Sequence, residues 1–356
     1  MNIEPNYQRM VDVALNKETD YIPLYDHIVD DSIMDAIMGT TVAGWNFGTL
    51  EQCDEYFRVY CDFYKQMGYD TVSYAGKIIE ILPNGGSLEN PIKQGVIQEQ
   101  ADFDAYPWDT IEELYFTKYD PIFTALARHM PEGMKAIGGV GNGVFEMVQD
   151  LVGYQDLCYL SVDEPELYAA LFQKCGEIWF TLWTRFLKQD YADAYCIPRT
   201  AEDWGFNANT LISADDIREH LIPHYVKLSK LVHETGKPFL FHNCGKIFSV
   251  MGDLIDTVGI DAKHSNEDSI APFSHWVKEY GDKIAFLGGI DMDVLCRMPP
   301  QEMDGYIRNM VEGCRKDGRF SGIALGAGNS IPDYVPVEQY LAMNKILRTL
   351  RVELRS

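Results

Sequence analysis

The sequence lacks the features that would bring the chain to a membrane or to nucleic acid. No apolar run approaches the roughly 20 residues that a membrane-spanning helix needs, and residues 1–7 have neither the basic nor the apolar part of a signal peptide. Positive charge is scarce, because 30 Lys and Arg residues face 54 Asp and Glu residues, for a net charge of −24. Phosphate groups are bound by clustered basic side chains. We therefore expect a cytoplasmic protein with no nucleic-acid or membrane partner.

Several short motifs are also missing. The eight cysteines contain no Cys-x-x-Cys pair and none of the dense spacing of disulfide-rich secreted proteins, so most are expected to be buried thiols in a reducing compartment. The sequence has no Gly-x-Gly-x-x-Gly turn, no phosphate-binding loop, no internal repeat and no Pro/Gly/Ser-rich linker. We expect residues 1–356 to form a single domain.

What the sequence does contain is an alternation of strand-like and helix-like runs. Apolar β-rich stretches are centred near residues 22, 71, 136, 195, 240, 261, 286 and 324. Eight strands predict an α/β fold, a (β/α)8 TIM barrel in residues 69–356, with residues 1–68 as an N-terminal helical extension. A doubly wound open sheet is the alternative, weakened by the missing nucleotide-binding turns.

Three further segments are assigned from local pattern. Two short β-rich runs predict a hairpin-like excursion within residues 76–100. Ser213 is expected to cap a helix that continues through Thr235. Apolar spacing predicts another amphipathic helix over residues 246–258.

Polar residues follow four consecutive strand-like runs in the C-terminal half. In a parallel α/β protein the site lies at the carboxyl ends of the strands, so these residues are expected to gather at one edge. The chain is therefore predicted to be an enzyme. The residues in question are His242 and Cys244, then His264 and Glu267, then Asp291, and finally Gly326, Gly328 and Asn329.

His242 and Cys244 form a His-x-Cys pair at a strand end. Imidazole and thiolate are both good zinc ligands, but a catalytic zinc site needs a third protein ligand. Glu267, after the next strand, offers an acceptable carboxylate oxygen. The alternative interpretation is that the pair merely packs in the core.

The other candidates each have a structural alternative. Asp203, which precedes Trp204 and Gly205, is a base, a ligand orienter, a substrate contact or a turn carboxylate. His264 is a hydrogen-bond donor that supports a metal ligand, an acid/base group or a structural histidine. Asp291 either orients substrate or closes a turn. The run from Gly326 through Gly328 to Asn329 would let the backbone approach a ligand or cofactor.

The order of these motifs resembles the uroporphyrinogen decarboxylase superfamily, and specifically its corrinoid-dependent methyltransferase branch. The resemblance covers roughly residues 130–350 and implies a (β/α)8 barrel with its site at the strand carboxyl ends. It rests on Gly143-Val-Phe-Glu146, Glu202-Asp-Trp-Gly205, the segment 213–223, His242-Asn-Cys-Gly245, Gly288-Gly-Ile-Asp291 and Gly326-Ala-Gly-Asn-Ser330.

The resemblance also implies a metal. In family members that methylate coenzyme M, zinc is held by a His-x-Cys pair and a later cysteine. His242 and Cys244 match the pair, but Ala327 stands where the later cysteine would fall, which argues against coenzyme M as substrate. Glu267 lies where the family can offer a carboxylate, so the implied ligands are His242, Cys244 and Glu267. The Arg-rich N-terminal motif of the true decarboxylases has no counterpart in residues 21–27, so porphyrinogen decarboxylation is not expected.

Three functions are compared. The first is a zinc-assisted methyltransferase that exchanges a methyl group between a small methylated compound, such as a methoxyaromatic, and the cobalt of a corrinoid (cobalamin). The chain has no Asp-x-His-x-x-Gly motif, so a separate corrinoid protein would be the partner. The second is a decarboxylase of another polycarboxylate, with Arg199, Lys246 and Lys263 as candidate anion-binding residues. The third is a non-catalytic binding protein on the same barrel.

Overall fold

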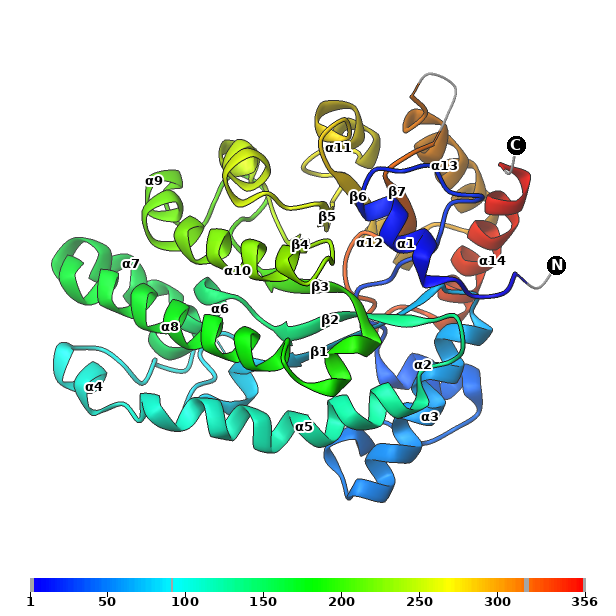
Figure 1. Cartoon of the computed structure of the whole chain (residues 1–356). Coiled ribbons are helices and arrows are strands. Elements are labelled where there is room, and N and C mark those ends of the chain that lie inside the picture. Colours follow the sequence, from blue (N-terminus) through cyan, green and yellow to red (C-terminus); the bar gives the residue numbers. More distant parts are fainter. Residues whose placement is uncertain (1–2, 91, 317–319, 355–356) are drawn as a thin grey trace.

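Seven parallel strands form one curled sheet, in which each strand pairs with its neighbour in sequence. The computed structural model describes residues 3–90, 92–316 and 320–354, and Figure 1 shows the strands enclosed by helices. The order β1 to β7 has no crossover, so all carboxyl ends meet at one edge of the sheet. The strands are β1 (Thr71–Lys77), β2 (Lys135–Gly141), β3 (Tyr195–Glu202), β4 (Leu240–Asn243), β5 (Ala262–His264), β6 (Ala285–Ile290) and β7 (Ile323–Ala327).

The expected strand near residue 22 is an extended segment and not a regular strand. It makes two isolated parallel bridges, from Leu24 to Leu325 and from Val29 to Ile331. Pro23 has no amide hydrogen to extend the ladder. The Ala327 amide donates to the Asp26 carboxylate at 2.8 Å, so this amide bonds to a side chain and not to the backbone of the extended segment. The prediction of strands at the other seven positions is confirmed.

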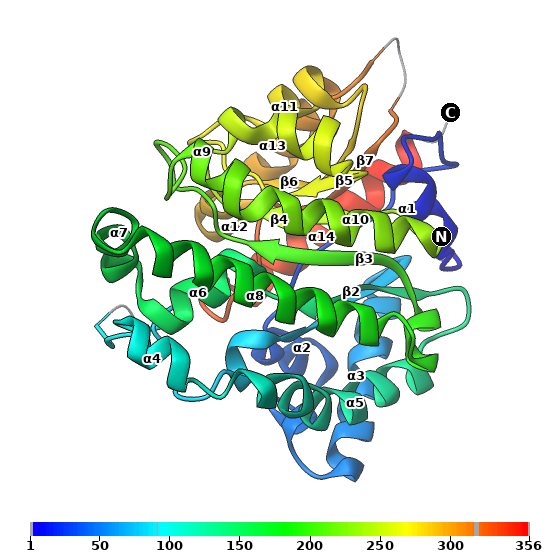
Figure 2. The same ribbon diagram turned by 60° about the vertical axis from the view of Figure 1, so that its left-hand side comes forward.

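Amphipathic helices cover the outside of the sheet, and α8 and α10 lie side by side over it in Figure 2. No helix in the described part of the chain is both long and apolar enough to cross a membrane. The longer helices are α2 (Asp31–Met38), α3 (Leu50–Gln66), α5 (Ile111–His129), α6 (Val144–Val152), α7 (Tyr154–Asp163), α8 (Pro165–Phe186), α10 (Ile222–Glu234), α11 (Phe273–Tyr280), α13 (Pro300–Gly313) and α14 (Val337–Glu353).

Helix α1 (Tyr7–Ala14) closes the amino ends of the strands. Its residues Met10, Val13 and Ala14 are buried against an apolar cluster inside the sheet. Asn6 caps the helix by accepting from the Gln8 amide at 3.1 Å. Because apolar side chains fill the amino end of the curled sheet, open space is left at its carboxyl end. The cluster comprises Tyr25, Ile137, Cys196, Ile197, Leu240, Ala262, Ala285, Leu287 and Ala324 in addition to the α1 residues.

Three local predictions have mixed outcomes. The hairpin expected within residues 76–100 is wrong, since the described residues there form the end of β1, a short 3-10 turn at Ile78–Ile81 and irregular loop. Ser213 caps α9 (Ala214–Asp216), accepting from the Asp216 amide at 3.0 Å. The helix passes through a π-turn at Ile217–Leu221 before α10, where Pro223 lacks an amide hydrogen.

The helix expected over residues 246–258 is irregular. It begins as a 3-10 turn at Phe248–Val250 and ends as a π-turn at Asp253–Val258. Gly259 closes it in the left-handed region at φ 75°, a conformation that favours glycine at a helix end.

Candidate active site

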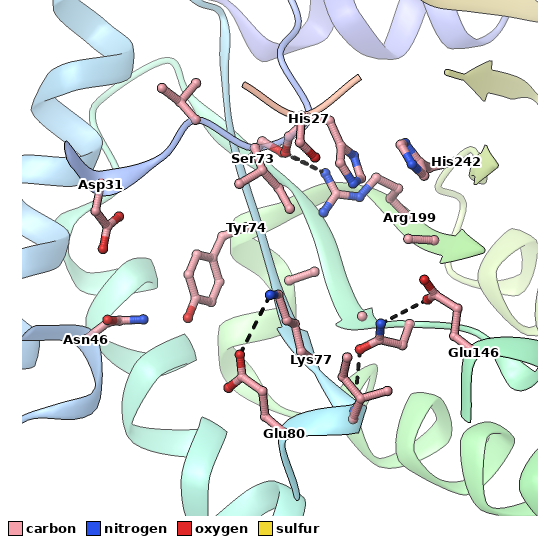
Figure 3. Close-up of a pocket in the computed structure, with 18 of the residues that line it drawn as sticks. His27, Asp31, Asn46, Ser73, Tyr74, Lys77, Glu80, Glu146, Arg199 and His242 are labelled. Atoms are coloured by element: carbon pink, nitrogen blue, oxygen red, sulfur yellow. Dashed lines mark hydrogen bonds and ion pairs between the residues drawn. The ribbon is translucent and has the colours of Figure 1, made fainter. Parts of the chain in front are cut away.

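A cavity of about 560 Å³ opens at the carboxyl end of the sheet. Its polar floor comes from the strand ends and from the extended segment, and includes His27, Ser73, Arg199, His242 and Cys244. Figure 3 shows His27 and His242 side by side, with the Arg199 guanidinium reaching toward Ser73. One wall is aromatic and is contributed by Phe47, Tyr56, Tyr60, Tyr74 and Tyr119.

His242 and Cys244 lie together, as the His-x-Cys spacing predicted. The Cys244 Sγ atom is 3.4 Å from Nε2 of His242. On the other side of the ring, Nδ1 of His242 is 2.7 Å from Nδ1 of His264. His264 Nε2 in turn is 3.1 Å from the carbonyl oxygen of Ala327.

This chain of contacts fixes the tautomers of both histidines. A carbonyl oxygen only accepts, so His264 carries its proton on Nε2 and accepts at Nδ1. Burial lowers the pKa of His264 to about 3 and that of His242 well below its usual range, so both rings are neutral. His242 must then donate from Nδ1, which leaves a lone pair on Nε2 that points toward Cys244. The ring is held in the form that a metal ligand requires.

The separation of the two candidate ligand atoms fits a shared zinc ion. Zinc bonds of about 2.3 Å to sulfur and about 2.1 Å to nitrogen, at the tetrahedral angle, place the two atoms about 3.6 Å apart. The observed 3.4 Å between Cys244 Sγ and His242 Nε2 is close to this value. The donor types and their spacing therefore suit zinc.

A second group of metal-capable atoms fits less well. In the described chain, His27, His242 and His264 have ligand atoms within 4.8 Å of one another. However, the His27 and His242 rings are stacked, with centroids 3.7 Å apart and planes 15° apart. Ring lone pairs lie in the ring plane, so those of stacked rings cannot converge on one ion. We interpret these histidines as a packed, hydrogen-bonded group.

Cys244 is half-buried and receives hydrogen bonds from neighbours on other strands. Asn329 Nδ2 donates to its sulfur at 3.4 Å and Ser265 Oγ at 3.7 Å. Burial, with the Asp203 carboxylate nearby, nevertheless raises the pKa of the Cys244 thiol. A thiolate at this position needs a cation, and a metal ion would provide one.

An acidic group lies at the start of α6. Glu202 is fully buried and accepts from the backbone amides of Phe145 and Glu146 at 3.0 and 3.2 Å, which places the Glu146 side chain at the cavity. Asn142 Nδ2 donates to Glu146 Oε2 at 2.9 Å. Burial, followed by repulsion from Glu202 and Asp203, raises the pKa of Glu146 well above its ordinary value. Glu146 therefore faces the cavity as a carboxyl group with a raised pKa.

Arg199 on β3 is another buried charge at the cavity, only 2% exposed. Its Nη1 donates to Ser73 Oγ at 2.7 Å and to Tyr25 Oη and the His27 carbonyl at 3.2 Å. Lys246 and Lys263, the other cations considered from sequence, do not line the cavity. Lys246 is exposed, while Lys263 is buried beside Trp276 and donates to the Ser265 carbonyl at 2.6 Å.

The structure brings some of the sequence candidates to the cavity and leaves others outside it. Asp203 and Asn329 line it, and His264 lies behind His242. Asp291 caps α12 (Met292–Arg297) by accepting from the Asp293 and Val294 amides, and also accepts from the Asp268 amide. Glu267 is half-buried and does not line the cavity.

Gly326 and Gly328 lie against other backbone segments. A Cβ on Gly326 would meet the Tyr25 carbonyl, and one on Gly328 would come within 2.4 Å of the Asn266 carbonyl. Close backbone packing therefore accounts for both glycines.

Sequence reasoning gave no functional role to His27, and named Glu146 only as part of a motif. The signal for His27 was present, since it follows the extended run from Tyr21 to Tyr25 as the other site residues follow their strands. Glu146 had no comparable signal because its environment depends on Glu202, which is 56 positions away.

A solved structure and a protein family resemble this chain over nearly its whole length. A methyltransferase from Methanosarcina mazei superposes with a TM-score of 0.71 at 14% identity, covering 98% of this chain and 99% of that one. N-acetylneuraminate lyase from Mycoplasma synoviae has a TM-score of only 0.35 at 11% identity, covering 92% of this chain and 78% of that one. No curated protein matches the sequence. The family described as "Uroporphyrinogen decarboxylase (URO-D)" matches residues 7–350, and the chain therefore belongs to the uroporphyrinogen decarboxylase family.

Proposed function

We propose that this protein is a methyltransferase that exchanges a methyl group between a small methylated compound and the cobalt of a separate corrinoid protein. The observation that carries the proposal is the 3.4 Å separation of His242 Nε2 and Cys244 Sγ at the cavity floor, with the His242 tautomer set by His264. The family membership and the shared fold with a methyltransferase support it.

Zinc is the proposed resident metal, held by His242, Cys244 and Glu267. When bound there, it would act as a Lewis acid on the heteroatom that carries the methyl group. Asp203 is the competing third ligand, because its carboxylate interacts with Cys244 whereas Glu267 does not line the cavity. Measuring zinc content in Glu267→Gln and Asp203→Asn separates the two, since the true ligand's variant should retain less metal.

The chain's own residues supply the remaining chemistry. The aromatic wall from Phe47 to Tyr119 suits a flat methoxylated ring. In the demethylation direction, the methyl carbon leaves its oxygen for cobalt and the oxygen needs a proton. Glu146 has the raised pKa of a proton donor, and Asn142 holds one of its oxygens, leaving the other toward the cavity.

The proposal includes a closed eight-membered ring, with residues 21–29 in the eighth place between β7 and β1. The two bridges to β7 support closure on one side. On the other side, Ser73 of β1 donates its hydroxyl hydrogen to the His27 carbonyl.

Methyl transfer can be tested directly. Zinc-loaded protein should convert free cob(I)alamin to methylcobalamin with at least one member of a panel of methoxylated aromatics and methylated amines, followed by absorbance. Cys244→Ala should lose this activity. Absence of transfer across the panel, with free cobalamin and with corrinoid proteins from the source cells, would contradict the proposal, and so would the absence of zinc after supplementation.

Decarboxylation is the second candidate, and the observation that favours it is Arg199. Within the described residues, only Lys77 and Arg199 are Lys or Arg side chains that line the cavity, and Lys77 has Glu80 and Glu89 near it at 4.0 and 3.9 Å. One unpaired cation suits a single anionic group better than a polycarboxylate. Release of carbon dioxide from a panel of small aromatic acids, without cobalamin, would favour this alternative.

A further inference from the structure

Within the described chain, Arg199 is a buried cation with no buried anion paired to it. Among the residues that the structure describes, no Asp or Glu side chain forms an ion pair or hydrogen bond with its guanidinium. The three groups that accept from Nη1 are neutral. Nε is enclosed without any partner, and no described residue accepts from Nη2.

A second arginine of this chain, Arg9, has acidic partners. Arg9, near the amino ends of the strands, is paired with the buried Asp70 and with Asp20, both at 2.7 Å. Pairing of this kind is the usual condition for burying a charge, because an isolated ion loses its hydration without compensation. Arg199 lies instead against the cavity. The missing anion can come from a ligand, which the cavity has room to admit.

The bonds of Nη1 also orient the group. They fix one nitrogen of the planar guanidinium to Ser73, Tyr25 and His27 on neighbouring segments. Nε is enclosed, so Nη2 is the nitrogen left to donate to a ligand in the cavity. A charged N–H donor of this kind forms a strong hydrogen bond with a carboxylate oxygen. A guanidinium that is held in place, with one nitrogen left for a ligand, is the arrangement expected of an anion-binding group.

We propose that Arg199 binds a carboxylate of the substrate, so that the substrates are small aromatic carboxylic acids. The aromatic wall would contact the ring and Arg199 the acid group. This deepens the proposed function because it names the class of methylated compound that the same cavity would take, and to that extent it rests on that function. The binding step itself involves neither cobalt nor methyl transfer.

The test compares benzoate with benzamide, which has nearly the same shape but no charge. Binding to the full-length purified protein is measured by calorimetry at constant ionic strength. Wild type should bind benzoate at least about 10-fold more tightly than benzamide, since a hydrogen bond to a charged group contributes about 1.5–3 kcal/mol. Arg199→Met should reduce this preference to near one.

Arg351→Met is the matched control. Arg351 is also a buried arginine with an unpartnered Nε, but it lies on α14 and does not line this cavity. The same change of charge there should leave the preference for benzoate intact. Loss of the preference in both variants would point to net charge and would overturn the assignment to Arg199.

The wild-type measurement decides the question even if Arg199→Met does not fold. Equal binding of benzoate and benzamide, or no binding of either, would overturn the proposal. A preference for benzoate that persists in Arg199→Met would also overturn it. Since no methyl group is transferred in these measurements, benzoate binding without methyl transfer would refute the proposed function alone. Methyl transfer without benzoate binding would refute only the carboxylate site.

Discussion

The two ends of the same strands have opposite character. At the amino end, α1 covers an apolar cluster that includes Ile197, Leu240 and Leu287. At the carboxyl end, the buried side chains His242, His264 and Arg199 are polar or charged. The change occurs within single strands, since β3 contains both Ile197 and Arg199. The comparison indicates that apolar burial at the amino ends of the strands stabilises the fold. This stabilisation offsets the free-energy cost of burying polar groups at the carboxyl ends.

The largest expected effect is on zinc affinity, and it should distinguish Cys244 at the carboxyl ends of the strands from Cys196 in the apolar cluster at their amino ends. Cys244→Ala should weaken zinc binding by more than about 1,000-fold, because losing a group that merely orients a ligand already costs about 10–100-fold. Cys196→Ala, in the apolar cluster, should leave zinc affinity unchanged. Both are measured by competition with a chromophoric chelator. Equal zinc affinities of the two variants would contradict the assignment of Cys244 as a ligand.

Shortening a side chain in the apolar cluster at the amino ends of the strands should lower stability and leave ligand binding unchanged. Leu287→Ala is expected to lower the free energy of unfolding by about 2–5 kcal/mol, since its side chain is 1% exposed and fills the apolar cluster. Urea denaturation measures the loss. Folded Leu287→Ala should bind zinc and benzoate as wild type does. Weakened ligand binding by the folded variant would show that the two ends are not independent.

Asp26 provides a pH-dependent test of the cost of polar burial. Burial raises the pKa of Asp26 from 3.8 to about 6, so the folded protein holds a proton that the unfolded chain has lost between these pH values. The free energy of unfolding therefore falls as pH rises from about 4 to about 6, by up to about 3 kcal/mol for this group. Asp26→Asn should remove that fall. The measurement is the difference between wild-type and variant stability at pH 4, 5, 6 and 7, and a difference that is constant with pH would contradict the expectation.

The smallest effect concerns the support of His242. His264→Ala should weaken zinc binding by about 10–100-fold, because His242 Nδ1 loses its acceptor and the ring its fixed tautomer. His264→Gln should recover part of the loss, since an amide both accepts and donates and could still reach the Ala327 carbonyl. Equal zinc affinities of the two variants would contradict a hydrogen-bonding role for His264.

Periodicity in the sequence predicted seven of the strands and the edge where the site lies, because strand ends are marked by local changes from apolar to polar residues. His242, Cys244 and Asn329 were identified on that basis and meet at the cavity. The segment near residue 22 was predicted as a regular strand, but Pro23 and the Asp26 carboxylate interrupt its pairing.

The features of the site that local sequence patterns did not predict depend on contacts between residues that are far apart in the sequence. Arg199 has no ion-pair partner among the described residues, which is a property of the assembled cavity and has no signature in the residues next to it in sequence. Glu202 was named from sequence only within a motif, whereas the structure shows that it accepts hydrogen bonds from the first amides of α6. The ligand role of Glu267 came from family resemblance and stays a prediction.

The bridges between residues 24–29 and β7 have a consequence for biosynthesis. Asp26 and its hydrogen-bond partner Ala327 are 301 positions apart, so the extended segment leaves the ribosome long before the strand against which it lies. Until β7 is made, the extended segment lacks the strand to which it bridges, and unpaired strand edges are the kind of surface on which partly folded chains associate. The bridges between the extended segment and β7 therefore form late in synthesis.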